Sequence, residues 1–318
     1  MDYTHVVGQR RVELVPDESV VAVRAGQTAA RTLTRLVGDH VSRAMTVQSE
    51  GVTLLKLQEP ASRDIVRDAV EGHRTAEEHS ACFRMGGHHL VAGSDVMVAF
   101  KRGARRSRIL SRMGVVTQEK LGNIYVVEHK EGRPFEIAQD LRDHKGVAWA
   151  EPHFTSVHHR PNVSGASTQA PTPARKRPEK GYEIRLTQVW NAWAVQSGNP
   201  NIKIAVIDEG IQVGHPSIKP IVARTYDAPN DRGRQYPKPW DYHGTACAGL
   251  AVSAPGSGPV RGFGGGCGLF AVRMGYTSDP KNQALVTKTL WMVRALNWAW
   301  KNGASVLSCS WSAGEQSN

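Results

Sequence analysis

A carboxylate and an imidazole stand at the ends of two elements that could bring them together. Asp208 ends the continuous apolar run KIAVID (203–208), which predicts a strand covered on both faces in a parallel sheet. His243 opens the small-residue segment HGTACAGLAVSA, which predicts a helix start that can pack closely on a sheet. In open α/β sheets, sites form at the carboxyl ends of strands. We therefore expect these two groups, which are suited to acid–base chemistry, at one sheet edge.

The elements around this pair alternate in the α/β manner. Strands are predicted at 268–274 and 304–311, and an amphipathic helix at 287–303. Leu290, Val293, Leu296, Trp298 and Trp300 would give that helix a broad apolar cover. The pattern predicts a partial parallel sheet with flanking helices and right-handed crossovers.

The N-terminal part predicts an α+β region made of two units with one element order. Strands at 19–24, 52–57 and 80–85 alternate with helical patterns, and strands at 95–101, 123–130 and 147–152 do the same. These units are interpreted as repeats over residues 12–86 and 88–155.

Residues 161–180 are rich in Pro, Ser, Thr and Ala and predict a linker. The expected domains are therefore 1–160, the linker 161–180, and 181–318. The net charge of +11 is diffuse, dense only at 101–108 and 174–180. This distribution argues against a nucleic-acid footprint, which gathers charge on one face.

No apolar run approaches the roughly 20 residues that span a bilayer. The N-terminus has no apolar signal core, so a cytoplasmic location is expected if this N-terminus is complete. The four cysteines Cys82, Cys247, Cys267 and Cys309 form no C-x-x-C pair, which argues against a zinc cluster and favours free, buried thiols.

Alone, Asp208 could be a turn former, and His-Gly-Thr could be a simple turn. Together, V-I-D-x-G-I and H-G-T-x-x-A-G are highly specific. KIAVIDEGIQVGHPSI, with His215 and Pro216, and HGTACAGL resemble the aspartate and histidine motifs of the subtilisin-like serine peptidases. LNWAWKNGASVLSCSWS is similar to a later helix–strand unit of that family, although Ser312 replaces its usual glycine. The resemblance covers roughly residues 182–314.

This resemblance implies a serine endopeptidase that hydrolyses peptide bonds with an Asp-His-Ser triad. Asp208 would orient His243, and His243 would shuttle the proton of a serine hydroxyl. Ser310 and Trp311 would contact the peptide or protein substrate, or would simply form a strand entering a turn. Calcium is a cofactor that only the family resemblance implies, because no acidic loop in the sequence has clear spacing of calcium ligands.

The α+β region resembles family propeptides, and VAWAEPHF is similar to their usual end. An intramolecular propeptide that inhibits the enzyme, with processing in or near 161–180, is therefore expected.

The family's nucleophile segment, Gly-Thr-Ser-x-x-x-Pro, does not follow His243 in this sequence. GASTQAP (165–171), centred on Ser167, mimics it but precedes Asp208 and runs into prolines and positive charges. The expectation is an inactive chain, truncated or half of a split protease, with an open apolar sheet edge at 304–311. Two alternatives stay open: a catalytically inactive propeptide-like binding or scaffold protein, and a basic nucleic-acid binder.

Overall fold

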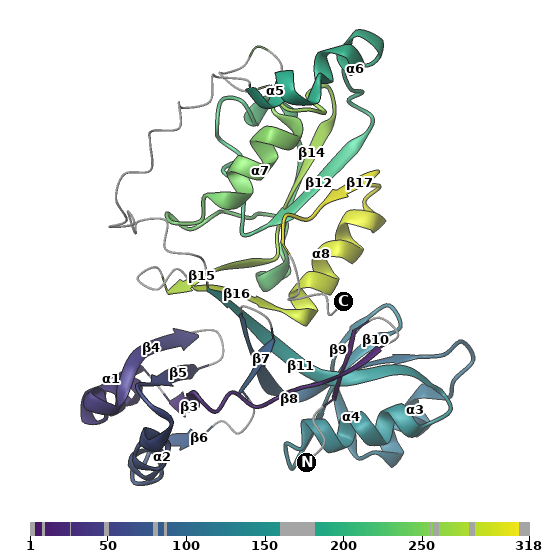
Figure 1. The fold of residues 1–318 in the computed structure, drawn as a ribbon. Coiled ribbons are helices and arrows are strands. Elements are labelled where there is room, and N and C mark those ends of the chain that lie inside the picture. The colour runs from purple at the N-terminus through teal and green to yellow at the C-terminus, as the bar shows by residue number, and fades with distance from the viewer. Residues whose placement is uncertain are drawn as a thin grey trace. The chain divides into compact units, whose positions relative to one another are not determined.

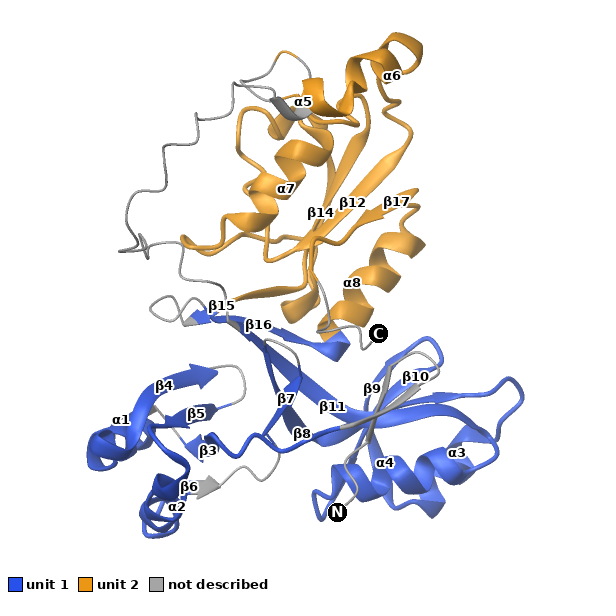
Figure 2. Ribbon diagram, viewed as in Figure 1, with its two compact units in different colours: residues 1–159, 278–290, 313–318 blue, residues 160–277, 291–312 orange. Residues whose placement is uncertain are grey.

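The computed structural model describes residues 4–7, 10–25, 27–47, 51–78, 82–85, 88–159, 182–254, 256, 261–279 and 284–311. The chain divides into two compact units, which are residues 1–159, 278–290 and 313–318, and residues 160–277 and 291–312 (Figure 2). The predicted linker 161–180 lies outside the described residues. The grouping of 278–290 with the first unit differs from the linear division expected from the sequence. None of the helices in the described ranges has the length and apolar character needed to cross a membrane.

An α+β part occupies residues 20–78 of the first unit. Its elements are β3 (Val20–Ala25), α1 (Gln27–Leu36), β4 (Val41–Val47), β5 (Val52–Leu57), α2 (Arg63–Glu71) and β6 (Ala76–Glu78). The four strands are antiparallel in the order β4-β5-β3-β6 (Figure 1). Alternate residues of β3 and β5 pack against both helices, and the most buried members of this core are Val21, Val23, Leu33, Leu55 and Val66.

A second α+β part follows at residues 88–159. Its elements are β8 (His88–Phe100), α3 (Arg106–Arg112), β9 (Val115–Leu121), β10 (Ile124–His129), α4 (Pro134–Asp143) and β11 (Val147–His159). The strands are antiparallel in the order β11-β8-β10-β9, and the first part has the order β6-β3-β5-β4. Its core centres on Val98, Val127, Ala138, Leu141 and Ala150, which are fully buried.

Further strands extend this second sheet. β7 (Cys82–Met85) pairs with β8, and β15 (Gly275–Asp279) and β16 (Ala284–Lys288) lie beyond β11. The strands β1 (Thr4–Val7) and β2 (Arg10–Glu13) pair with each other in a separate two-stranded sheet. β16 is antiparallel to β11, from Thr155 opposite Lys288 to His159 opposite Ala284. The strand predicted at 80–85 as the end of the first repeat was therefore misplaced. Its residue Phe83 is fully buried where β7 pairs with β8, and β6 takes the predicted place.

Asp17 joins β8 to the loop before β3 through hydrogen bonds of its carboxylate. Its carboxylate accepts hydrogen bonds from His89 Nε2 at 3.0 Å and from Ser19 N at 2.9 Å. The bond from His89 is the main reason that the pKa of Asp17 lies well below its usual range, although burial opposes this. A depressed carboxyl pKa stabilises the fold above the unfolded value and loses that contribution as pH falls.

We therefore expect Asp17→Asn to flatten the fall in unfolding free energy between about pH 5 and pH 2. Urea unfolding followed by circular dichroism at several pH values measures the slope. Asp39→Asn, at an exposed position of the same unit, is the control and should keep the wild-type slope. Equal slopes for Asp17→Asn and the wild type would contradict the assignment.

The second unit is an α/β fold, as predicted. Its elements are α5 (Tyr182–Thr187), α6 (Val189–Val195), β12 (Lys203–Asp208), β13 (Val222–Asp227), α7 (His243–Val252), β14 (Gly268–Arg273), most of α8 (Thr289–Lys301) and β17 (Val306–Ser308). The strands are parallel in the order β13-β14-β12-β17.

Helices cover both faces of this sheet. Leu269 and Ala271 of β14 pack with Ala248 of α7, whereas Phe270 lies 5.6 Å from the Trp298 ring of α8. Successive strand residues point to opposite faces, so α7 and α8 lie on opposite sides. Trp300, predicted as part of the apolar cover, is instead 70% exposed.

The edge of the sheet is short and open. The strand predicted over 304–311 pairs with β12 only at 306–308. Val306 and Leu307 are 49% and 42% exposed. In the part of the chain that the structure describes, β17 is therefore an apolar edge strand.

Candidate active site

The first side chain of the site is fixed by the end of β12. Asp208 is the last residue of this strand, is 3% exposed, and lies opposite Arg273 at the end of β14. Its Oδ1 accepts the backbone N–H of Glu209 at 2.8 Å, and its backbone carbonyl accepts the N–H of Met274 at 2.8 Å. The carboxylate is thus held rigidly at the carboxyl edge of the sheet.

The second side chain is placed by the start of α7. The backbone N–H of His243 donates to Glu209 Oε1 at 2.7 Å, so a buried carboxylate caps the positive end of this helix. At Gly244 the helix passes so close to the strand that a Cβ would lie 2.4 Å from Gly210 O and 2.9 Å from Asp208 Cβ. The small residue is what allows the helix to start against the strand end, as expected.

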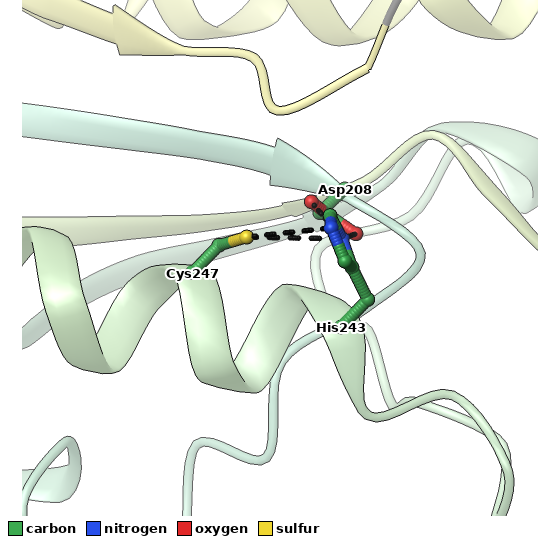
Figure 3. Close-up of side chains that lie close together, drawn as sticks. All are labelled: Asp208, His243 and Cys247. Atoms are coloured by element: carbon green, nitrogen blue, oxygen red, sulfur yellow. Dashed lines mark hydrogen bonds and ion pairs between the residues drawn. The ribbon is translucent and has the colours of Figure 1, made fainter. Parts of the chain in front are cut away.

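These two elements bring Asp208 and His243 into direct contact (Figure 3). His243 Nδ1 lies 3.0 Å from both oxygens of the Asp208 carboxylate. The His243 side chain is 45% exposed, and the Asp208 side chain is 5% exposed. The ionised carboxylate only accepts, so it selects the tautomer in which Nδ1–H donates. Nε2 is then the basic nitrogen, and the pair can accept a proton there while Asp208 stabilises the resulting charge.

A thiol lies close to both members of this pair. Cys247 Sγ, one turn along α7, is 3.7 Å from His243 Nδ1 and 3.8 Å from Nε2 (Figure 3). Burial raises the pKa of this thiol, while a hydrogen bond with the Ser310 side chain acts in the opposite direction. The segment after β17 therefore reaches the same site.

The two predicted substrate contacts occupy different places. Ser310 is exposed and lies near Cys247, beside the Asp208–His243 pair. The indole N–H of Trp311 donates to Ile207 O at 2.8 Å, which anchors it to β12. Their contact with a substrate stays a prediction.

The sequence analysis missed two residues of this site, Glu209 and Cys247. Glu209 caps α7, and its only sequence signal is an acid directly after the strand-terminal aspartate. Cys247 was predicted as a free, buried thiol, and it is free but only half-buried. Its spacing of four residues from His243 puts both on one helix face. All four cysteines are free, and Cys309 is exposed rather than buried.

The other motif residues are structural or undescribed. His215 Nδ1 accepts the backbone N–H of Ser217 at 3.2 Å, which stabilises a turn. Ser167 lies outside the described residues.

A pocket of about 950 Å³ lies along the outer side of α7. Apolar residues of two loops line it, including Ile211, Ile218 and Pro237, together with Thr245 and Leu250 of the helix. Its size and apolar walls are typical of a site that accepts an apolar ligand group.

Gly244→Ala is expected to separate the Asp208 and His243 side chains, which are called the dyad below. The added methyl group has no space between Gly210 and Asp208, so α7 must move or the fold must strain, at a cost of about 1–3 kcal/mol. Gly249→Ala on the same helix is the control, because its Cβ would meet nothing within 4 Å. Urea unfolding and the NMR signal of the His243 Nδ1 proton provide the two measurements. Equal stability and an unchanged proton signal in both variants would contradict the close approach.

Comparison with known proteins finds similarity to one family in the second part of the chain. A sequence model of the Subtilase family matches residues 199–318. Over 124 residues the chain is 34% identical to a calcium-dependent protease of Nostoc sp. and 33% identical to one of Trichormus variabilis. Each match covers 38% of this chain and 17% of the relative, so the chain spans about a sixth of the length of these curated relatives.

Solved structures give weaker likenesses. Fervidolysin from Fervidobacterium pennivorans, a keratinolytic enzyme related to subtilisin, has a TM-score of 0.45 at 16% identity, covering 73% of this chain and 36% of fervidolysin. The epidermin leader peptide processing serine protease of Staphylococcus aureus has a TM-score of 0.42 at 14% identity, covering 68% of this chain and 49% of that protein. The similarity to the subtilases is therefore a similarity of sequence over residues 199–318.

Proposed function

We propose that the protein, whose residues 199–318 match the subtilase family, is a subtilisin-like serine endopeptidase. The observation that carries the proposal is the contact between His243 Nδ1 and both oxygens of Asp208 at 3.0 Å. In this mechanism His243 Nε2 takes the proton of a serine hydroxyl as the hydroxyl attacks a peptide carbonyl. His243 then returns the proton to the leaving amine, while Asp208 holds the ring and stabilises the imidazolium.

The serine nucleophile is supplied, in this proposal, by a segment that completes the sheet next to β17. The exposed apolar edge at Val306 and Leu307 supports it, because an open strand edge is a template for pairing with another strand. A complementary C-terminal half, covalent or separate, is therefore the proposed partner.

Residues 1–159 are proposed as a propeptide-like region made of two ferredoxin-like repeats. The strand orders β6-β3-β5-β4 and β11-β8-β10-β9, each with the element order of a split βαβ fold, support this. Release of this region would follow processing in or near residues 161–180. Ser310 is the proposed contact to the substrate near the dyad, and peptides or proteins are the proposed substrates.

Calcium has no assigned site in this proposal, although the relatives are named calcium-dependent. Among the described residues, the group of three close side-chain ligands is Asp208, His243 and Cys247. Ca²⁺ takes six to eight oxygen ligands, and this set with its nitrogen and sulfur donors does not fit it. No step of the mechanism therefore uses calcium.

Labelling with a fluorophosphonate tests the proposal. The natural protein that carries these 318 residues should be labelled at one serine, identified by peptide mapping, and the labelling should be abolished by His243→Ala. His215→Ala, at a histidine of the same unit that stabilises a turn, is the control and should leave labelling intact.

The exposed edge of β17 also favours a second candidate, a catalytically inactive protein that binds a partner through this strand. A folded natural protein that stays unlabelled and shows no peptidase activity would support this candidate and contradict the first.

A further inference from the structure

Three side chains of different chemistry converge beyond the end of β12. A carboxylate, an imidazole and a thiol have ligand atoms that all lie within 4.8 Å of one another (Figure 3). His243 Nδ1 lies 3.0 Å from the Asp208 carboxylate, and Cys247 Sγ lies 3.7 Å from the same nitrogen. Ligands of one tetrahedral zinc ion, at about 2.0–2.3 Å from the metal, are about 3.3–3.6 Å apart. The cluster is therefore close to the spacing of a three-ligand site.

We propose that Asp208, His243 and Cys247 bind a thiophilic divalent cation, with Zn²⁺ as the physiological ion, and that the ion switches the dyad off. An ion on Nδ1 lies in the plane of the imidazole ring, so the Cys247 and Asp208 side chains would both rotate to reach it. The fourth position would face solvent, since the His243 side chain is 45% exposed. Three protein ligands with one open position are a normal arrangement for zinc.

The ligand set selects the class of metal. A thiolate and an imidazole favour Zn²⁺ and other borderline or soft ions, whereas Mg²⁺ and Ca²⁺ prefer oxygen. On binding, the thiol gives up its proton to solvent, and the ion replaces the proton on His243 Nδ1. The neutral ring keeps one proton, now on Nε2, so one proton is released for each ion bound and no electron is transferred.

Neighbouring groups would orient the ligands. The Ser310 side chain lies near Cys247, and the backbone N–H of Glu209 donates to Asp208 Oδ1 at 2.8 Å. Such outer partners fix ligand orientation in metal sites. Loss of activity on binding rests on the proposed function. With the ion on Nδ1, the ring keeps its one proton on Nε2, the nitrogen that must accept the serine proton. The binding itself does not depend on that function.

Cobalt titration of the full chain tests the site. Co²⁺ substitutes for Zn²⁺ as a spectroscopic probe, and a bound thiolate gives a sulfur-to-cobalt charge-transfer band. We expect this band in the wild type under reducing conditions, and its loss when Zn²⁺ is added in competition. Cys247→Val should abolish the band and weaken Zn²⁺ binding, measured by calorimetry, by more than the roughly 10–100-fold that loss of an outer partner costs.

Matched variants keep the test decisive. Cys309→Ser removes the exposed cysteine and should retain the band. Cys247→Ser preserves side-chain size, so it separates loss of the ligand from misfolding, and circular dichroism checks each variant. A folded wild type without the band, or a band that persists in Cys247→Val, would overturn the site. If the serine is labelled but the charge-transfer band is absent, the metal site is contradicted and the proposed peptidase function is not. If the band is present but no serine is labelled, the proposed peptidase function is contradicted and the metal site is not.

Discussion

Replacing Asp208 with Asn is expected to lower kcat by about 10⁴-fold in the natural protein. The carboxylate at 3.0 Å accepts the Nδ1–H of His243, and an amide can instead donate to that nitrogen and select the wrong tautomer. Nε2 would then carry the proton and could not take one from the nucleophile. His243→Ala removes the base itself and is expected to cost about 10⁶-fold. Hydrolysis of a fluorogenic peptide measures both effects.

The control for this prediction is Asp231→Asn in the same unit. Asp231 is exposed and accepts a hydrogen bond from the Tyr226 hydroxyl, which an asparagine side chain can still accept. Its kcat should equal that of the wild type. The double variant Asp208→Asn/His243→Ala should be no slower than His243→Ala, since the two residues act as a unit. If Asp208→Asn had the wild-type kcat, Asp208 would have no role in the mechanism.

The sequence predicted the elements whose patterns are strong. β12 was predicted with its observed bounds because a continuous apolar run matches a strand buried on both faces. The helix beginning at His243 was also predicted, and Gly244 shows why a small residue must follow it. The strand VARTYD, which forms β13, was not predicted, because its middle residues Ala223 and Arg224 are exposed and it lies at an edge.

Contacts between distant segments were outside the reach of sequence patterns. β16 is a short strand between β14 and α8, and nothing in its own residues indicates that it pairs with β11. The cap that Glu209 gives to α7 and the bond from Trp311 to Ile207 likewise depend on the sheet being assembled. The grouping of Cys247 with Asp208 and His243 was missed because metal-site motifs are recognised by short Cys and His spacings, and Asp208 is far away along the chain.

The largest stability effect is expected at the buried ion pair between β13 and β14. Asp227 is fully buried, and its two oxygens accept bonds from Arg273 Nε at 2.8 Å and Nη2 at 2.9 Å. Arg273→Met leaves a buried carboxylate without its main partner, which costs about 3–5 kcal/mol. Because Arg273 lies opposite Asp208 in the sheet, the variant also loosens the strand end that holds the dyad. Urea unfolding of the full chain measures the loss.

Arg133→Met is the matched control, since it breaks an ion pair with Glu131 at the surface. The side chains of Arg133 and Glu131 are 53% and 66% exposed. An exposed pair is worth at most about 1 kcal/mol, so this variant should unfold almost as the wild type does. The double variant Asp227→Leu/Arg273→Met removes both charges and should recover part of the loss, because no isolated charge stays buried. Recovery stays incomplete, since Asn230 and Arg232 also donate to Asp227 Oδ2. If Arg273→Met cost no more than Arg133→Met, the ion pair would not hold the strand ends together.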